Sequence, residues 1–374
     1  METTEKDQTK SRIIQPKQLG LGGVALFLLI LLGLFFWAEK TPPFSQSNNS
    51  RILYLGWETG EDVNQLFTID AEGNAQKRLT DEPLGVLDYA VAPDGSQIVY
   101  TVFNQDDSVD LWQIDSLGRN RKQLLDCVKA ICTTPEWAPD GRRLIYERRE
   151  IVAAGEMPTN PQLWWLDTQT GETIPVFEDA EQLGLGARIS PNGRYLSYIS
   201  SIHPEIHVYN MESGERIIIP SQTGQPGTWS PDSTTLLSSD IQFQGEQFST
   251  HLFSLDLETA ELTNISGVEL DSNDSLPVFS PNGEWIAFGR KKPRAPMGKQ
   301  LWLMRPDGSD AISLTENADI HYNNASWSPD GKQIVVQGFN QAEAESEPGL
   351  WLVDVADGAL TALISPGIQP TWLR

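Results

Sequence analysis

The chain is poor in the residues that most often carry catalysis, metal binding or phosphate binding. Its 374 residues include four His and two Cys, and 27 basic residues stand against 51 acidic ones, a formal net charge of −24. This deficit of basic residues argues against nucleic acid as a partner, because phosphate is bound by basic surfaces. The sequence also lacks a Gly-x-Ser-x-Gly nucleophile motif and a phosphate-cradling glycine loop preceded by a strand.

The histidines do not form a convincing metal motif. His203 and His207 flank Glu205, but Pro204 and the strand-like pattern that follows argue against the helix that a His-Glu-x-x-His site needs. In an extended chain, four residues span about 13 Å. The sequence therefore predicts no metal site, no cofactor and no catalytic residue.

Long uncharged runs are also scarce, with one exception near the start. Residues 19–38 form 20 residues without a charge, about the length of a bilayer-spanning helix, and Lys10, Arg12 and Lys17 precede them. We expect a cytoplasmic tail over 1–18, an uncleaved transmembrane anchor over 19–38, a linker over 39–50 and an exported domain over 51–374. A cleaved signal peptide is the alternative, but Phe36 stands where a small residue should precede the cleavage site.

The two cysteines, Cys127 and Cys132, lie close together in a predicted loop. Export to a periplasmic or cell-surface location would let them pair, provided that the segment between them reverses direction. We therefore predict a disulfide, with two free thiols as the alternative.

Turn residues recur along the exported part at a spacing of 40 to 52 residues. Each copy has a large apolar residue, then Pro two places later, then Asp or Asn, and in most copies Gly, a pattern that predicts a tight turn between two strands. The defining residues are Pro93, Asp94, Gly95; Trp137, Pro139, Asp140, Gly141; Pro191, Asn192, Gly193; Trp229, Pro231, Asp232; Phe279, Pro281, Asn282, Gly283; Trp327, Pro329, Asp330, Gly331; and Trp372 in a final, shortened copy.

A second apolar phrase, such as Leu111-Trp112 or Leu301-Trp302, lies between successive turns. Together the phrases predict four short strands per repeat, as in the blades of a β-propeller. We count seven blades, with six as the alternative. The first strand, at 51–54, and the last, at Trp372, lack partners within their own repeats, so we expect them to complete one blade together and close the ring.

The repeated phrase resembles the WD40-like repeat (PD40) of the TolB family, whose signature runs as an aromatic residue, Ser, Pro, Asp, Gly, two variable residues and a strand. Trp327–Val336 and Trp137–Tyr146 follow it most closely, while Ser233 replaces Gly in one copy. The resemblance covers residues 51–374 and implies an all-β propeller. TolB itself has six blades behind a separate N-terminal α/β domain, whereas here a predicted anchor precedes the propeller.

Function is expected on the face that carries the long connections between second and third strands. These connections are predicted at 149–162, 240–250, 289–299 and 341–348, and the cysteines belong to a loop on the same face. One of them holds a basic cluster that we predict as a candidate partner-binding loop: Arg290, Lys291, Lys292, Arg294 and Lys299. Its alternative is a solvated loop whose charges meet acidic neighbours.

The sequence as a whole predicts a membrane-anchored, single-pass protein whose extracytoplasmic propeller binds a protein or a cell-envelope polymer without catalysis. The alternative is a carbohydrate-active enzyme of the lyase or glycosidase type with its site over the propeller channel. An enzyme should gather acid and base groups there. Of the residues that precede the first-strand apolar positions, only Glu136 and Arg188 are charged, and we expect them to pair with each other.

Overall fold

The computed structural model describes residues 50–153, 156–179, 182–267, 271–292, 298–343 and 345–373. The predicted tail, the anchor at 19–38 and nearly all of the linker lie outside these residues, as does Arg294 of the basic cluster. In the described ranges all regular structure is β, and no helix is long and apolar enough to cross a bilayer. Residues Ser47–Arg374 group into one compact unit.

The strands form antiparallel sheets, which confirms the all-β prediction. Five sheets have four strands each, ordered β28-β1-β2-β3, β12 to β15, β16 to β19, β20 to β23 and β24 to β27; β4 to β11 form one larger sheet, joined by a short parallel pairing of β6 with β8. The bounds are β1 (Arg51–Gly56), β2 (Gln65–Asp70), β3 (Lys77–Arg78), β4 (Val86–Val91), β5 (Gln97–Phe103), β6 (Val109–Asp115), β7 (Lys122–Leu125), β8 (Ala130–Trp137), β9 (Arg143–Glu150), β10 (Gln162–Asp167), β11 (Thr173–Pro175), β12 (Gly184–Ile189), β13 (Tyr195–Ser200), β14 (Glu205–Asn210), β15 (Arg216–Pro220), β16 (Thr228–Trp229), β17 (Thr235–Gln244), β18 (Gln247–Asp256), β19 (Leu262–Asn264), β20 (Asn273–Phe279), β21 (Ile286–Lys291), β22 (Gln300–Met304), β23 (Ile312–Ser313), β24 (Ile320–Trp327), β25 (Gln333–Asn340), β26 (Gly349–Asp354), β27 (Leu360–Ile364) and β28 (Ile368–Trp372).

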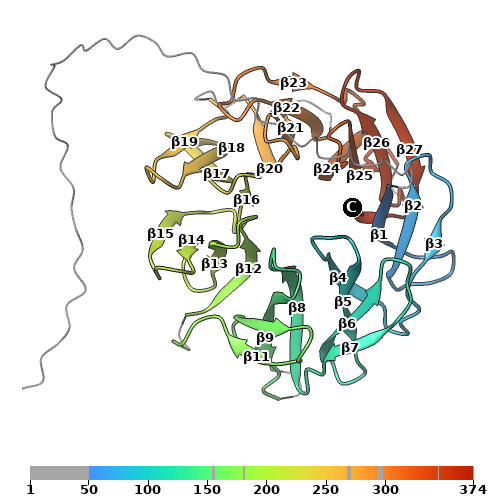
Figure 1. Cartoon of the computed structure of the whole chain (residues 1–374). Helices are drawn as coiled ribbons and strands as arrows, with labels where there is room; N and C mark the ends of the chain where they lie inside the picture. Colours follow the sequence, from blue (N-terminus) through green and yellow to red (C-terminus); the bar gives the residue numbers. More distant parts are fainter. Residues whose placement is uncertain are drawn as a thin grey trace, which may run out of the picture. The chain divides into compact units, whose positions relative to one another are not determined.

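The sheets follow one another around a ring, and the strands toward its inside, here called inner strands, include β4, β8, β12, β16, β20 and β24 (Figure 1). Strand β28, from the end of the chain, pairs with β1, so the prediction that both ends complete one sheet is confirmed. Tryptophans of the inner strands link neighbouring sheets, because each indole N–H donates to a carbonyl of the preceding inner strand: Trp137 to Ala90, Trp229 to Arg188, Trp327 to Val278 and Trp372 to Ser326.

The core lies between neighbouring sheets. The second strand of several sheets carries a fully buried aromatic ring, and these rings are among the largest buried side chains: Tyr54, Tyr100, Tyr146, Tyr198 and Phe288. They pack with aliphatic residues of the adjoining sheet, as Tyr100 does with Leu53 and Leu55. The core is therefore shared between neighbours rather than enclosed within one sheet.

The turns between first and second strands have two structural roles that explain their residues. The Asp or Asn side chain accepts a hydrogen bond from the backbone N–H two residues later, as Asp330 does from Lys332. The Gly adopts positive φ, and the position of its absent side chain faces the Pro of the preceding turn, as Gly331 faces Pro281 and Gly193 faces Pro139. These contacts place the turns of neighbouring sheets on one face of the ring.

We expect the turn carboxylates to make stability depend on acid. The N–H of Ser96 lowers the pKa of Asp94, and the hydroxyl of Ser230 followed by the N–H of Thr234 lowers that of Asp232. Groups with a lowered folded-state pKa stabilise the fold above their unfolded pKa, and this contribution is lost as pH falls from about 4 toward 2. Urea midpoints should therefore drop over this interval.

The replacement Asp232→Asn introduces a side chain that does not titrate and that two other turns already carry at this position, as Asn192 and Asn282. Its urea midpoint should fall less between about pH 5 and pH 3 than that of the unmodified chain. An identical fall in both proteins would contradict a role for this carboxylate.

Candidate partner-binding face

The loops that join second to third strands and fourth to first strands lie opposite the tight turns, since strand direction alternates within each sheet; we call this side the long-loop face. Long connections at 151–161, 292–299 and 341–348 confirm three of the predicted loops. Their predicted ends shift slightly, because Arg149 and Glu150 still belong to β9, and Arg290 and Lys291 are the last residues of β21.

The predicted loop at 240–250 is wrong. Strands β17 and β18 continue through it with ten residues each, and only Gly245 and Glu246 form the turn between them. Gly245 has positive φ, which suits the first central position of a two-residue hairpin turn. The result is a hairpin that extends beyond the strand β16 beside it.

Most of the exposed large apolar side chains lie on the long-loop face. Fifteen large hydrophobic residues of the described ranges are exposed, and nine of them lie on loops or strand ends of this face: Leu84, Leu87, Phe103, Val128, Val152, Met157, Ile202, Phe243 and Phe248. Five others lie on outer strands, Ile174, Ile218, Leu262, Ile312 and Leu360, and Leu117 lies on the tight-turn side. Most of the exposed large apolar side chains thus lie on one face of the ring, and exposed apolar surface is a feature of interaction sites.

The basic cluster is largely engaged within the protein. Arg290 donates from Nε and Nη2 to the two carboxylate oxygens of Asp274, at 2.7 and 2.6 Å, and the Asp274 side chain is fully buried. The ammonium group of Lys299 donates to Ser275, and burial lowers the pKa of Lys299. Lys291 and Lys292 remain exposed, with Lys292 over the ring of Trp302.

The predicted disulfide between Cys127 and Cys132 is confirmed. Both cysteines are fully buried, and the buried carboxylate of Asp110 accepts the N–H of Cys127 at 2.8 Å. The bridge therefore holds a tight loop between β7 and β8, and Val128 within it is left exposed to solvent.

The charged pair of the inner strands forms as expected: Arg188 lies 3.6 Å from Glu136. Burial raises the pKa of Glu136, which Arg188 opposes, and burial also raises the pKa of Asp88. Asp88 accepts the N–H of Thr134 from the next inner strand, and Glu147 likewise accepts the N–H of Gly186. The carboxylates that gather here thus join neighbouring sheets.

The contacts between neighbouring inner strands include a feature that the sequence does not predict. Most inner strands contain a β-bulge just before the aromatic or apolar residue, and four bulge residues other than Gly have φ near 50°: Thr134, Leu276, Asn324 and Gln369. Side chains of the second strands accept the bulge N–H of the next sheet, as Gln337 does from Gln369. Nothing in the residue types signals this, because positive φ is unusual for Thr and Leu.

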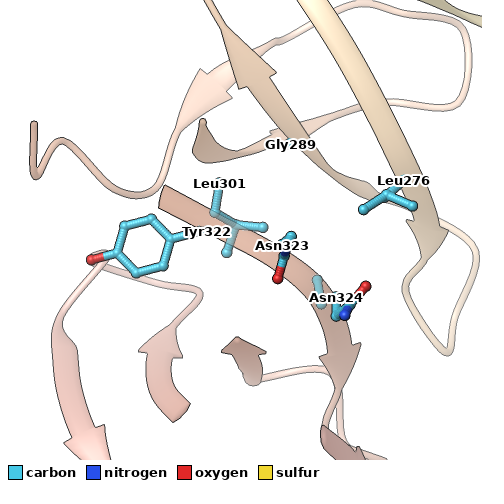
Figure 2. Close-up of a pocket in the computed structure, with 7 residues that line it drawn as sticks. Leu276, Gly289, Leu301, Tyr322, Asn323 and Asn324 are labelled. Atoms are coloured by element: carbon cyan, nitrogen blue, oxygen red, sulfur yellow. The ribbon is translucent and has the colours of Figure 1, made fainter. Parts of the chain in front are cut away.

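Gly289 on β21 occupies the register position that Glu147 occupies on β9 and Gln337 on β25. Because Gly289 has no side chain to fill the space between the two sheets, a cavity of about 10 Å³ lies there. Leu276 on one strand and Asn323 and Asn324 on the next line it (Figure 2). The volume suits one water molecule, and the buried Oδ1 of Asn323 has no hydrogen-bond partner within the described residues.

The histidines occupy ordinary structural positions. His207 lies between Glu205 and Tyr198, with each contact at 3.1 Å, and the fully buried His251 bonds Ser249 and Asn264. No group of three or more His, Cys, Asp or Glu within the described ranges is arranged to hold a metal ion.

Comparison with known proteins identifies the family. The model of the TolB beta propeller domain, PD40, matches residues 163–364, more than half of the chain. The chain belongs to this family. Its TolB-like fold also appears in the solved TolB of Acinetobacter baumannii, at 15% identity and a TM-score of 0.50, covering 86% of this chain and 82% of that one.

The TolB-like fold is shared with enzymes as well. Prolyl endopeptidase structures match at 14% identity with a TM-score of 0.59, over 84% of this chain and 48% of theirs. The uncharacterized peptidase YuxL of Bacillus subtilis (strain 168) is 24% identical over 194 residues, which are 42% of this chain and 29% of that protein. The chain thus spans less than a third of this relative.

Proposed function

We propose that this TolB-like propeller is a non-catalytic scaffold that binds a protein partner through its long-loop face. The observation that carries the proposal is the concentration of exposed apolar side chains on that face. A few residues at the centre of an interface supply most of the binding free energy once they are desolvated. The rigid ring and the buried disulfide support the proposal, because ordered loops lose less conformational entropy on binding.

The proposal includes the architecture and location expected from the sequence. Seven blades account for the strands in order, since β28 with β1 to β3 makes one set of four and β4 to β27 make six more. The apolar segment at 19–38 would anchor the chain in a membrane, with the propeller on the extracytoplasmic side. Its partner would then be an envelope protein. A cell-envelope polymer remains the other outcome of the test below.

The test is capture from native membranes with the full chain as bait, followed by identification of bound proteins and glycans. One variant replaces Val152, Met157 and Ile202 of the long-loop face by Ser, and its matched control replaces Ile174, Ile218 and Ile312 of the outer strands by Ser. We expect the first variant alone to lose its partner by about tenfold or more. Equal retention by both variants would overturn the proposal.

A second candidate function rests on the raised pKa values of Glu136 and Asp88 near Arg188. Both carboxyl groups interact with Arg188, and carboxyl groups with raised pKa values are suited to acid–base catalysis, as a carbohydrate-active enzyme would need. The hydrogen bond from Thr134 and the Glu136–Arg188 pair favour the structural role. A shortened oligosaccharide in the capture experiment, abolished by Glu136→Gln, would favour the enzyme instead.

A further inference from the structure

The β17–β18 hairpin has an inner edge that its own sheet does not cover. Strand β16 has only two residues, Thr228–Trp229, whereas the other inner strands have five to eight. Strand β17 has ten residues and pairs with β16 at Leu236 and Leu237 alone. The remainder of this edge therefore has no neighbouring strand.

The register shows which backbone groups point to that edge. Gln244 pairs with Gln247 across the two-residue turn, which makes them a hydrogen-bonded pair; the next pair, Phe243 with Phe248, is then non-hydrogen-bonded, and so is Ile241 with Thr250. In such pairs the N–H and C=O groups point away from the partner strand. Thr250 agrees with this assignment, because its N–H donates outward to Asn273 at 3.0 Å.

Among the described residues, the segment before β16 covers this edge as far as Asp240. The loop before β16 reaches it at Ser239, whose carbonyl accepts from Thr223, and at Asp240, whose carboxylate accepts the N–H of Gln222 at 2.7 Å. Beyond that point, among the described residues, the N–H groups of Ile241 and Phe243 have no hydrogen-bond partner. The carbonyl of Phe243 accepts only from the adjacent, solvent-accessible side chain of Gln242, at 3.3 Å.

The surroundings of the edge suit an apolar and positively charged ligand. The rings of Phe243 and Phe248 contact each other, with centroids 6.1 Å apart, and are 60% and 66% exposed. Asp240 and Glu246 flank them, and no Lys or Arg lies between residues 240 and 250. The chain as a whole carries a net charge of −24.

We propose that the inner edge of β17 at Ile241 and Phe243 binds an extended segment of a partner protein as an added strand. This inference rests on the proposed partner-binding function of the long-loop face. The segment pairs its backbone with Ile241 and Phe243, places apolar side chains beside the two phenylalanine rings, and carries Lys or Arg. Strand addition supplies affinity through main-chain hydrogen bonds and specificity through alternate side chains.

Two proline variants test the edge with a matched control. Phe243→Pro removes an aromatic ring and the N–H of the inner edge, whereas Phe248→Pro removes the paired ring and an N–H of the outer edge. Neither removes a hydrogen bond between β17 and β18, because both positions are non-hydrogen-bonded. The probe is a phage-displayed library of random peptides, selected on the immobilised full chain.

We expect enriched peptides that alternate apolar residues with Lys or Arg, that bind Phe243→Pro about tenfold or more weakly, and that bind Phe248→Pro within about threefold. In the unmodified chain, the bound peptide should slow amide hydrogen exchange at Ile241 and Phe243, a readout that does not depend on how the variants fold.

Equal weakening by both prolines, no slowing of exchange, or no enriched peptide would each overturn strand addition. The capture experiment tests the proposed function independently of the edge. A membrane partner that is lost with the Val152, Met157 and Ile202 variant but retained by Phe243→Pro would sustain the scaffold and reject the edge.

Discussion

The replacement Arg290→Ala should destabilise the fold by about 3–5 kcal/mol, which is the typical cost of removing one partner of a buried ion pair. Asp274 and Arg290 are directly opposed on β20 and β21, and the Asp274 side chain has no exposed area. Ser266 also donates to this carboxylate, at 2.7 Å. Without the guanidinium, the buried carboxylate would keep, among the described residues, this neutral donor and the more distant ammonium group of Lys299. Urea unfolding followed by fluorescence measures the loss.

The exposed pair of Lys332 and Asp330, separated by 3.6 Å, is the matched control. Lys332→Ala should cost less than about 1 kcal/mol, because solvent screens exposed ion pairs. The double variant Arg290→Ala with Asp274→Ala should cost less than the sum of the two single changes, since the charge left unpaired is then gone. A midpoint for Arg290→Ala equal to that of the unmodified chain would show that Asp274 is not stabilised by this contact.

This expectation changes how the predicted basic cluster should be tested. Arg290 and Lys299 are bound to neighbouring side chains, so a binding defect after their removal would report a folding change. Lys291 and Lys292 are the described members whose removal tests contact with a partner. Sequence showed five basic residues close together, but the pairing of Arg290 with Asp274 depends on the register of two strands. That register is a tertiary property.

The features that sequence predicts correctly have local causes. Pro, Asp and Gly specify a tight turn wherever they occur in this order, so the repeats and the closing strand are recognisable from the residues alone. The inner bulges are not, because Thr134 and Leu276 adopt positive φ only under the constraint of neighbouring sheets. The hairpin does have a local signal: Phe243 and Phe248 lie symmetrically about Gly245-Glu246, as cross-strand partners around a two-residue turn do.

The replacement Trp372→Ala should also destabilise the fold strongly, because Trp372 belongs to β28, the strand that closes the ring. Trp372 is buried against Ile52 and Val335, and its indole N–H donates to the carbonyl of Ser326 at 3.1 Å. Truncation of a buried Trp costs about 3–5 kcal/mol. Trp372→Phe should cost less, because it keeps most of the apolar contact and loses the hydrogen bond, a net contribution of about 0.5–1.5 kcal/mol.

Trp327→Ala is the control that distinguishes an opened ring from a simple loss of packing. Trp327 occupies in β24 the position of Trp372 in β28, and its indole N–H donates in the same way to the carbonyl of Val278. Both alanine variants should lose similar stability in urea. Strand β24 is joined to β25 through a tight turn, whereas β28 and β1 pair across the two ends of the domain without a turn between them. Amide exchange in β1 should therefore accelerate in Trp372→Ala and stay slow in Trp327→Ala. If β1 exchanges equally fast in both variants, the pairing of β28 with β1 is not what keeps the ring closed.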